Sequence, residues 1–167
     1  WSLLLVDEQK DELYFAIVTG PAAESLKKVR LKMGEGIAGW VAQHGEPVIS
    51  PDVYSDPRFA KRIDDMVKFQ TRTMVCTALR AKGRVIGVIQ LINCPVEKMG
   101  EKEMSFLQSL CDYAGMAIDN ARALESRDAK GVEETAVPRE GHHRTTGKRQ
   151  LGRHGGRHGE PASAQPA

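Results

Sequence analysis

The sequence predicts an α+β fold, in which helices cover a β-sheet and one long helix ends the ordered part of the chain. Two runs of β-forming residues, Ser2–Val6 and Leu13–Thr19, flank a polar hexapeptide that can pair them as a hairpin. A second pair of β-forming runs, Thr73–Arg80 and Arg84–Ile92, is separated by a short turn. Apolar residues then recur at spacings of three and four from Glu101 to Glu125, which indicates an amphipathic helix.

Shorter elements are predicted between the two hairpins. Pro21–Lys28 holds helix-forming residues behind a proline, and Val29–Lys32 alternates like a short strand. Ile37–His44 places its apolar residues on one helical face, and Gly45 is typical of a helix C-terminal stop. The pair Val48–Ile49 precedes a turn with proline, which predicts a short edge strand.

The second half of the domain is expected to begin with an irregular segment. Asp52–Lys68 is polar and rich in turn residues, with one helix expected at Phe59–Val67. Both alternating sets of side chains in Arg84–Ile92 are fairly apolar, as in a central strand that is covered on two faces. The long helix starts with Glu101 and Glu103 in its first turn, where the helix dipole favours acids.

Residues 1–125 form the predicted domain and residues 126–167 the predicted tail. Because 41% of all residues are apolar, the chain can bury a core of ordinary size. The first 125 residues carry 16 basic and 17 acidic side chains, a balance that does not indicate nucleic-acid binding. The tail carries 8 basic and 5 acidic side chains and few large apolar residues, so we expect it to be basic and disordered.

Three further features concern the origin and the location of the protein. An apolar run follows Trp1 directly, so we expect a fragment of a longer protein whose N-terminal helix has been cut off. The chain has no run of the roughly 18 apolar residues that a membrane span needs. The cysteines Cys76, Cys94 and Cys111 are odd in number and lack metal-ligand spacing, which predicts a cytoplasmic protein without a metal site.

Six separated groups of residues follow one another in a characteristic order along residues 1 to about 125. They are Ser2-Leu-Leu-Leu-Val-Asp with Glu12-Leu-Tyr-Phe, Gly34-Glu-Gly-Ile-Ala-Gly-Trp-Val-Ala, Gly45-Glu-Pro-Val-Ile, Pro51-Asp-Val-Tyr-Ser-Asp-Pro-Arg-Phe, Gly83-Arg-Val-Ile-Gly-Val-Ile-Gln-Leu-Ile-Asn, and Ala117-Ile-Asp-Asn-Ala. In this order and spacing they resemble the GAF domain family. The resemblance implies a profilin-like or PAS-like fold, with a central antiparallel sheet, helices on both sides and a ligand pocket on one face.

The resemblance also implies a range of functions. Members of the family sense small molecules, including cyclic nucleotides and tetrapyrroles, or serve as dimer scaffolds for an attached output domain. Cyclic-nucleotide-binding members have an Asn-Lys pair after the fifth strand; here Asn93 is present, but Cys94 replaces the lysine and Met99 replaces a downstream aromatic residue. Bilin-binding members have a Cys-His pair, and His44 has no cysteine beside it. Cyclic-nucleotide binding therefore stays an open alternative, whereas a bilin photoreceptor is not expected.

The expected ligand pocket lies between the sheet and a covering segment. Its candidate residues come from the glycine-rich helix start, the polar segment and the strand ends: Gly36, Trp40, Asp52, Arg58, Phe59, Phe69, Met74, Cys76 and Asn93. Arg58 and Phe59 could hold a planar anionic ligand by bidentate hydrogen bonding and stacking. At Gly36 the start of a helix could approach an anion.

Several candidates also have a purely structural interpretation. Gly36 could serve a tight turn and close packing. Trp40 could belong to the core, because it shares a helical face with apolar neighbours. Asp52 could cap local N–H groups, as acids in turns often do. Cys76 lies in an apolar strand that would keep its thiol protonated and inert.

The sequence thus predicts a non-catalytic sensor or regulatory module of signal transduction. A small molecule would bind in the pocket, and its binding would be relayed through Glu101–Glu125 to the partner in a homodimer or to an output domain. No nucleophile has a base placed near it by sequence, so no catalytic residue is expected, and the sequence names no cofactor. One alternative is a dimerisation scaffold without ligand. Another is a methionine sulfoxide reductase, which would need a cysteine in the segment 45–72, where none occurs.

Overall fold

The fold is described by a computed structural model for residues 1–134. Its strands form one six-stranded sheet in the order β3-β2-β1-β6-β5-β4, and all neighbouring strands are antiparallel. The strands are β1 (Ser2–Asp7), β2 (Glu12–Val18), β3 (Arg30–Lys32), β4 (Val48–Ser50), β5 (Met74–Ala81) and β6 (Arg84–Ile92). The predicted central antiparallel sheet is confirmed.

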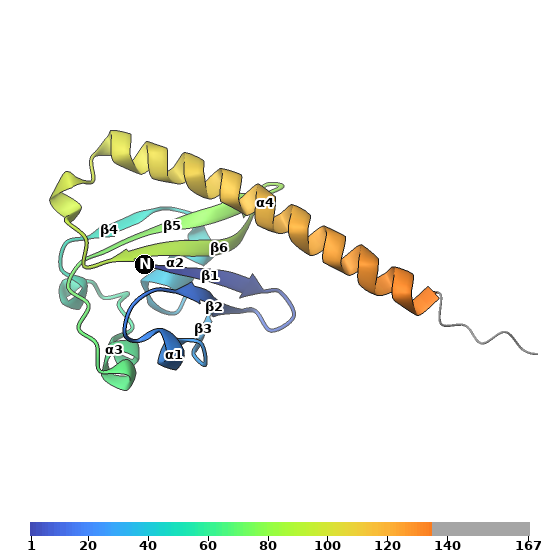
Figure 1. The fold of residues 1–167 in the computed structure, drawn as a ribbon. Coiled ribbons are helices and arrows are strands. Elements are labelled where there is room, and N and C mark those ends of the chain that lie inside the picture. The colour runs from blue at the N-terminus through green and yellow to red at the C-terminus, as the bar shows by residue number, and fades with distance from the viewer. Residues whose placement is uncertain (135–167) are drawn as a thin grey trace, which may run out of the picture.

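Helices cover both faces of the sheet, as Figure 1 shows, with α4 crossing one face and α1 and α3 below the other. The helices are α1 (Ala23–Leu26), α2 (Gly36–His44), α3 (Lys61–Val67) and α4 (Glu101–Glu134), with short 3-10 turns η1 (Val53–Ser55) and η2 (Val96–Lys98). Helix α1 is shorter than the predicted Pro21–Lys28. No helix among these described residues is both long and apolar enough to span a membrane.

Two antiparallel hairpins join to make the centre of the sheet. In the first, Val6 of β1 pairs with Leu13 of β2, and in the second, Met74 of β5 pairs with Ile92 of β6. Strand β1 then pairs with β6, which makes these two strands the middle of the sheet. The prediction that Arg84–Ile92 forms a central strand is therefore confirmed.

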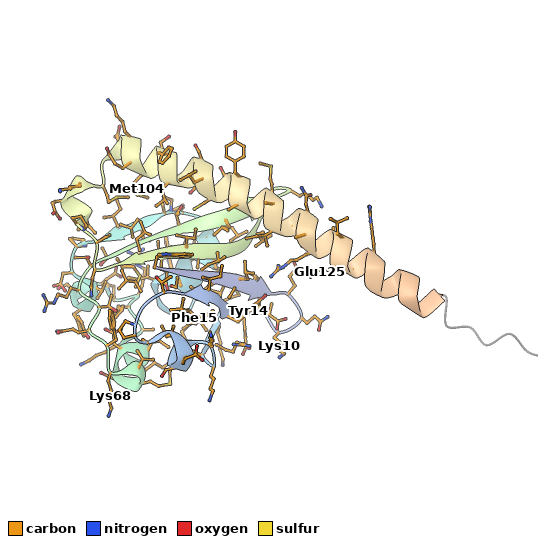
Figure 2. All side chains as sticks on the ribbon, in the orientation of Figure 1. Lys10, Tyr14, Phe15, Lys68, Met104 and Glu125 are labelled. Atoms are coloured by element: carbon orange, nitrogen blue, oxygen red, sulfur yellow. The ribbon has the colours of Figure 1, made fainter. Side chains whose placement is uncertain are left out.

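The sheet separates two apolar cores. Adjacent residues of β2 belong to different cores: Phe15 packs with α1 and α2, whereas Tyr14 packs with residues under α4. Both residues are labelled in Figure 2. This alternation follows from the period of two along a strand, which sends successive side chains to opposite faces.

Helix α2 ends where the sequence predicts. Gly45 has a left-handed backbone (φ 73°), and its N–H donates to the carbonyl of Val41 at 2.7 Å. The guanidinium of Arg80 donates to the carbonyl oxygen of Gly45 at 2.6 Å, so β5 holds the end of this helix.

Helix α4 is longer than predicted, because it continues to Glu134 instead of ending at Glu125. The expectation of an irregular chain from residue 126 is wrong for residues 126–134, which are helical. The loss of apolar residues after Leu124 removes packing, but Arg, Ala, Lys and Glu still propagate a helix that has already formed. The predicted disorder of residues 135–167 lies outside the described residues.

Candidate functional site

The candidate site is a small apolar cavity of about 60 Å³ on the face of the sheet opposite α4. Four apolar side chains of the sheet form its floor, namely Phe15, Leu31, Met74 and Ile92. Met74 and Ile92 are directly paired across β5 and β6, so the floor lies at one end of the central hairpin. The floor of the pocket is thus built on strands of the sheet.

The roof of the pocket is the segment between β4 and β5, residues 51–73, which we call the lid. It contributes Phe59, Ile63, Val67 and Phe69. Ile63 and Val67 are four residues apart on α3, so both point to the same side of that short helix. The lid therefore covers the pocket on this face of the sheet.

The start of α2 closes one side of the pocket. Gly36 has a left-handed backbone (φ 69°), and a Cβ atom there would lie 3.1 Å from the Cβ of Ala60 in the lid. A glycine is required at this position both for the backbone conformation and for the close approach of the lid.

A carboxylate fastens the lid to α2. Glu35 Oε1 accepts a hydrogen bond from Arg62 Nε at 2.6 Å, and Glu35 Oε2 accepts one from the backbone N–H of Lys32 at 3.0 Å. Burial raises the pKa of Glu35, but the two hydrogen bonds and the nearby cations outweigh it and leave the pKa below its usual value. Glu35 is therefore ionised at neutral pH and holds Arg62 of α3 in place.

Asp64 is the charged group of the pocket wall. Its side chain is 6% exposed. Its carboxylate accepts from the N–H of Thr71 at 2.6 Å, from the Thr71 hydroxyl at 2.7 Å and from the Tyr54 hydroxyl at 3.2 Å. These bonds tie both ends of the lid to α3, so Asp64 shapes the roof of the pocket.

Gln90 is the polar group of the floor. It lies on β6 in the row of side chains between Val88 and Ile92, and it is 6% exposed. Its Oε1 accepts from the Ser2 hydroxyl at 3.0 Å. Its Nε2 has one recorded partner among the described residues, the sulfur of Met74 at 3.5 Å.

Four of the predicted site residues line this pocket: Gly36, Phe59, Phe69 and Met74. Trp40, Asp52, Arg58, Cys76 and Asn93 are placed elsewhere, and each is engaged in the structure of the domain.

Arg58 and Trp40 stack on one another outside the pocket. The guanidinium carbon of Arg58 lies 4.6 Å from the centre of the Trp40 ring, and the other neighbour of that ring is His44, at 4.3 Å between centroids. Arg58 also pairs with Asp56 at 2.7 Å, and this hydrogen-bonded pair lowers the pKa of Asp56 below its usual value. Arg58 is thus occupied by an aromatic ring and a carboxylate, while its neighbour Phe59 turns into the pocket.

The other three residues bind the protein's own backbone or core. Asp52 accepts from the N–H of Tyr54 at 3.1 Å and so caps η1. Asn93 accepts from the N–H of Arg72 at 2.6 Å and fixes the end of the lid to the end of β6. Cys76 is fully buried in β5, and burial raises the pKa of its thiol far above the usual value.

The remaining thiols are also poor nucleophiles. Burial raises the pKa of Cys111, under α4, to about 11. Cys94 is half-buried, and burial again raises its pKa. None of the described cysteines lines the pocket, and no cluster of potential metal ligands occurs within residues 1–134.

Asp64, Thr71 and Gln90 are the polar lining residues that the sequence did not predict, together with several apolar ones. A polar Gln90 between Val88 and Ile92, in a row of otherwise apolar side chains, was a visible signal. Asp64 had no comparable signal, because Asp65 stands next to it and only the register of α3 decides which of the two faces inward.

A second cleft lies between the middle of α4 and the sheet, and several of its charged groups are paired. Asp119 of α4 accepts a hydrogen bond at 2.7 Å from Lys82, which lies in the turn between β5 and β6. Arg122 donates to the Tyr14 hydroxyl at 3.1 Å. We interpret this cleft as a set of ties that hold α4 to the sheet, because Asp119 and Arg122 already bind side chains of the sheet and its turn.

A comparison with known families supports this architecture. The family model described as "GAF domain" matches residues 1–118. The chain therefore belongs to the GAF domain family. In this chain, the apolar pocket described above lies under a lid on one face of the sheet.

The related proteins are much longer than this chain. It is 38% identical over 98 residues to the dual 3',5'-cyclic-AMP and -GMP phosphodiesterase 11A of Takifugu rubripes. The aligned region covers 57% of this chain and 11% of that protein. It is 31% identical over 133 residues to the probable 3',5'-cyclic phosphodiesterase pde-5 of Caenorhabditis elegans, covering 74% of the chain and 18% of that protein. The chain thus corresponds to less than a fifth of either phosphodiesterase.

Solved structures show the same fold. The GAF domain of a phosphoenolpyruvate-protein phosphotransferase from Acinetobacter has a TM-score of 0.63 at 25% identity, covering 75% of this chain and 73% of that one. The free methionine-R-sulfoxide reductase of Neisseria meningitidis, in complex with its substrate, has a TM-score of 0.54 at 27% identity, covering 65% and 60%. A GAF domain of a phosphotransferase and a free methionine-R-sulfoxide reductase therefore share this fold, and the fold alone does not decide the function.

Proposed function

We propose that this domain is a non-catalytic sensor of signal transduction, which binds a small molecule in the pocket and relays binding through α4. The observation that carries the proposal is that strands β5 and β6 line the pocket on one face of the sheet and pack against α4 on the other. Met74, Gln90 and Ile92 of β5 and β6 line the pocket. Leu79 and Ile86 of the same strands pack under α4. A ligand that favours one position of these strands would also favour one position of the helix.

The outer side of α4 supports pairing with a second copy of the chain. Six residues that are all exposed follow one another at spacings of four and three, and we call them the outer seam: Phe106, Leu110, Tyr113, Ala117, Asn120 and Leu124. Among its large apolar side chains, Phe106 is 66% exposed, Tyr113 70% and Leu124 60%. Such spacing is typical of a coiled-coil seam, and an identical helix offers an identical seam.

The inner side of α4 is already occupied, so pairing would not compete with the fold. Leu107, Cys111 and Ile118 pack against the sheet, and Gly115 lies against the backbone of Arg80. We therefore expect a homodimer in which the two α4 helices lie side by side and carry a change of state towards an output domain. The relatives are several times longer than this chain, which leaves room for such a domain.

The two alternatives explain the site less well. A scaffold without ligand would be favoured by a pocket filled with Trp40, Phe69 and Met74, but Trp40 stacks outside it and a cavity of about 60 Å³ remains. A methionine sulfoxide reductase would need a thiol at the pocket. The described cysteines lie elsewhere, and their pKa values are raised.

Three free thiols also favour our expectation of a cytoplasmic location.

The dimer is tested by charging the outer seam. Leu110→Glu and Tyr113→Glu should each give a monomer at tens of micromolar in sedimentation equilibrium, whereas the wild-type chain should sediment as a dimer. Both residues are exposed, so the substitutions should leave the fold of the monomer intact. Ser105→Glu is the matched control, because Ser105 is also exposed on α4 but lies away from the seam. A wild-type monomer, or a dimer that survives both seam substitutions, would contradict the proposal.

A further inference from the structure

The pocket combines apolar walls with very few polar side chains. Among the described residues that line it, Asp64 is the charged one, and Thr71 and Gln90 are the polar ones. A ligand must therefore bury apolar surface and place its polar atoms opposite these three groups. Their hydrogen-bonding capacity limits its chemistry.

Gln90 offers a donor to the pocket. Its amide nitrogen carries two hydrogens, and its one recorded partner is the thioether sulfur of Met74, a weak acceptor. The side chain is 6% exposed, so water has little access to it. A ligand carbonyl would provide the stronger acceptor that this buried donor lacks. The first turn of α2 lines the same pocket, and the N–H groups of a first helical turn also favour an acceptor.

The charges around the pocket oppose a full negative charge on the ligand. Asp64 carries its carboxylate in the wall, and no basic residue is found among the described lining residues. Two of the three arginines of the lid are bound to acids outside the cavity, Arg58 to Asp56 and Arg62 to Glu35, and the third, Arg72, lines a separate cleft. An anion would therefore meet Asp64 in a poorly solvated site without a free cation to compensate.

The size of the cavity limits the ligand further. One water needs at least 10–15 Å³ measured in the same way, so about 60 Å³ corresponds to roughly half a dozen non-hydrogen atoms. Pockets for molecules of drug size usually have about 300–1,000 Å³. A cyclic nucleotide would require the lid to open widely and would bring a phosphate towards Asp64.

We propose that the pocket selects a small uncharged molecule, of about half a dozen non-hydrogen atoms, that joins a branched apolar group to a carbonyl accepting from Gln90. This inference rests on the proposed function, since it assumes that the pocket binds a ligand. It adds that Asp64 rejects anions of the same shape. Isobutyramide has the required shape and chemistry, and isobutyrate is its anionic isostere.

The experiment is a titration of the ¹⁵N-labelled full chain followed by NMR, with isobutyramide, isobutyrate and cyclic GMP as probes. We expect isobutyramide to shift the side-chain amide signals of Gln90 and to bind about tenfold more tightly than isobutyrate, which corresponds to about 1.4 kcal/mol. In Asp64→Asn this preference should fall to within about twofold, because the repelling charge is gone. In Gln90→Met, isobutyramide should bind about fivefold more weakly, as for one lost hydrogen bond.

Matched controls separate the site from general effects. Asp65→Asn is the control for Asp64→Asn, because Asp65 is exposed on the same helix. Gln43→Met is the control for Gln90→Met, because Gln43 is exposed on α2. Both should bind the probes like the wild type.

The outcomes distinguish this inference from the proposed function. Tighter binding of isobutyrate or cyclic GMP at the pocket would overturn the inference and leave a ligand-binding sensor. A preference for isobutyramide that persists in Asp64→Asn would overturn the role given to Asp64. If none of the probes shifts pocket signals in any variant, this inference is contradicted, whereas the proposed relay through α4 is tested separately by the outer-seam variants.

Discussion

At the scale of single residues, carboxylates join parts of the chain that are distant in sequence. Glu35 binds Arg62 and so connects α2 to the lid. Asp64 connects α3 to the backbone of Thr71, next to β5. Asp119 connects α4 to Lys82, between β5 and β6. The partners of Glu35 and Asp119 lower the pKa of each acid, so these two contacts should depend on pH.

Asp119 gives the clearest prediction of pH dependence. The hydrogen bond from Lys82, with the charges of Lys82 and Arg84, holds the pKa of Asp119 below its ordinary value of 3.8 despite partial burial. A lowered folded-state pKa stabilises the fold above the unfolded-state value, and this contribution is lost as the pH falls through the folded-state value. We expect Asp119→Asn to lower the thermal unfolding temperature near neutral pH and to flatten its decline at acidic pH.

The measurement is the unfolding temperature between about pH 2 and pH 7, where carboxylates titrate. Glu125→Gln is the control, because Glu125 is an exposed acid of the same helix. Parallel pH curves for wild type and Asp119→Asn would show that the tie between Asp119 and Lys82 contributes nothing.

At the scale of elements, α4 is held on the sheet by a close backbone contact and a polar network. A Cβ atom at Gly115 would lie 2.3 Å from the carbonyl oxygen of Arg80, so the helix reaches the backbone of β5 directly. Gln108 donates to the carbonyl of Ala78 at 3.1 Å and to Asp112 at 2.9 Å, and it accepts from Thr77. These bonds have a specific geometry and fix the register of the helix, which apolar packing alone would leave less defined.

Gly115→Ala should therefore displace α4 from the sheet. The added methyl group cannot be accommodated against a backbone oxygen, and we expect a loss of about 1–3 kcal/mol in the free energy of unfolding, as for overpacked cores. Urea unfolding measures it. Gly100→Ala is the control, because its Cβ would approach only the flexible carboxylate of Glu103, at 3.0 Å. Equal stabilities of the two variants would refute the close contact.

At the scale of the whole molecule, the strands and their pairing followed from local patterns. Alternating residues in Arg84–Ile92 and a polar turn after Val6 predicted the two hairpins and the central strand, because the period of two is a local property. The end of α4 did not follow, since helix propagation after Leu124 needs no apolar face. For the site, the sequence predicted Gly36, Phe59, Phe69 and Met74 but neither Asp64 nor Gln90, whose roles depend on tertiary contacts.

The relay between the pocket and the dimer is a property of the whole molecule. We expect Ile63→Phe, which fills the pocket from the lid, to change the dissociation constant of the dimer by about fivefold, a typical coupling between two sites. Met66→Phe is the matched control, because Met66 is exposed on the same helix. Sedimentation equilibrium gives both constants. Identical constants for Ile63→Phe and wild type would mean that the two faces of the sheet are not coupled.

The contact of Gly115 with Arg80 determines how α4 can move. At Gly115 the helix is pressed onto a strand backbone and cannot slide along it without a clash, but it can tilt about that point when the ties of Asp119 to Lys82 and of Arg122 to Tyr14 are released. From Gly115 to Glu134 the helix forms an arm of about 28 Å, at 1.5 Å per residue. Figure 1 shows this arm projecting beyond the sheet. A tilt of about 10° would swing its tip by about 5 Å, one helical turn, so a small adjustment in the strands becomes a large displacement at the far end.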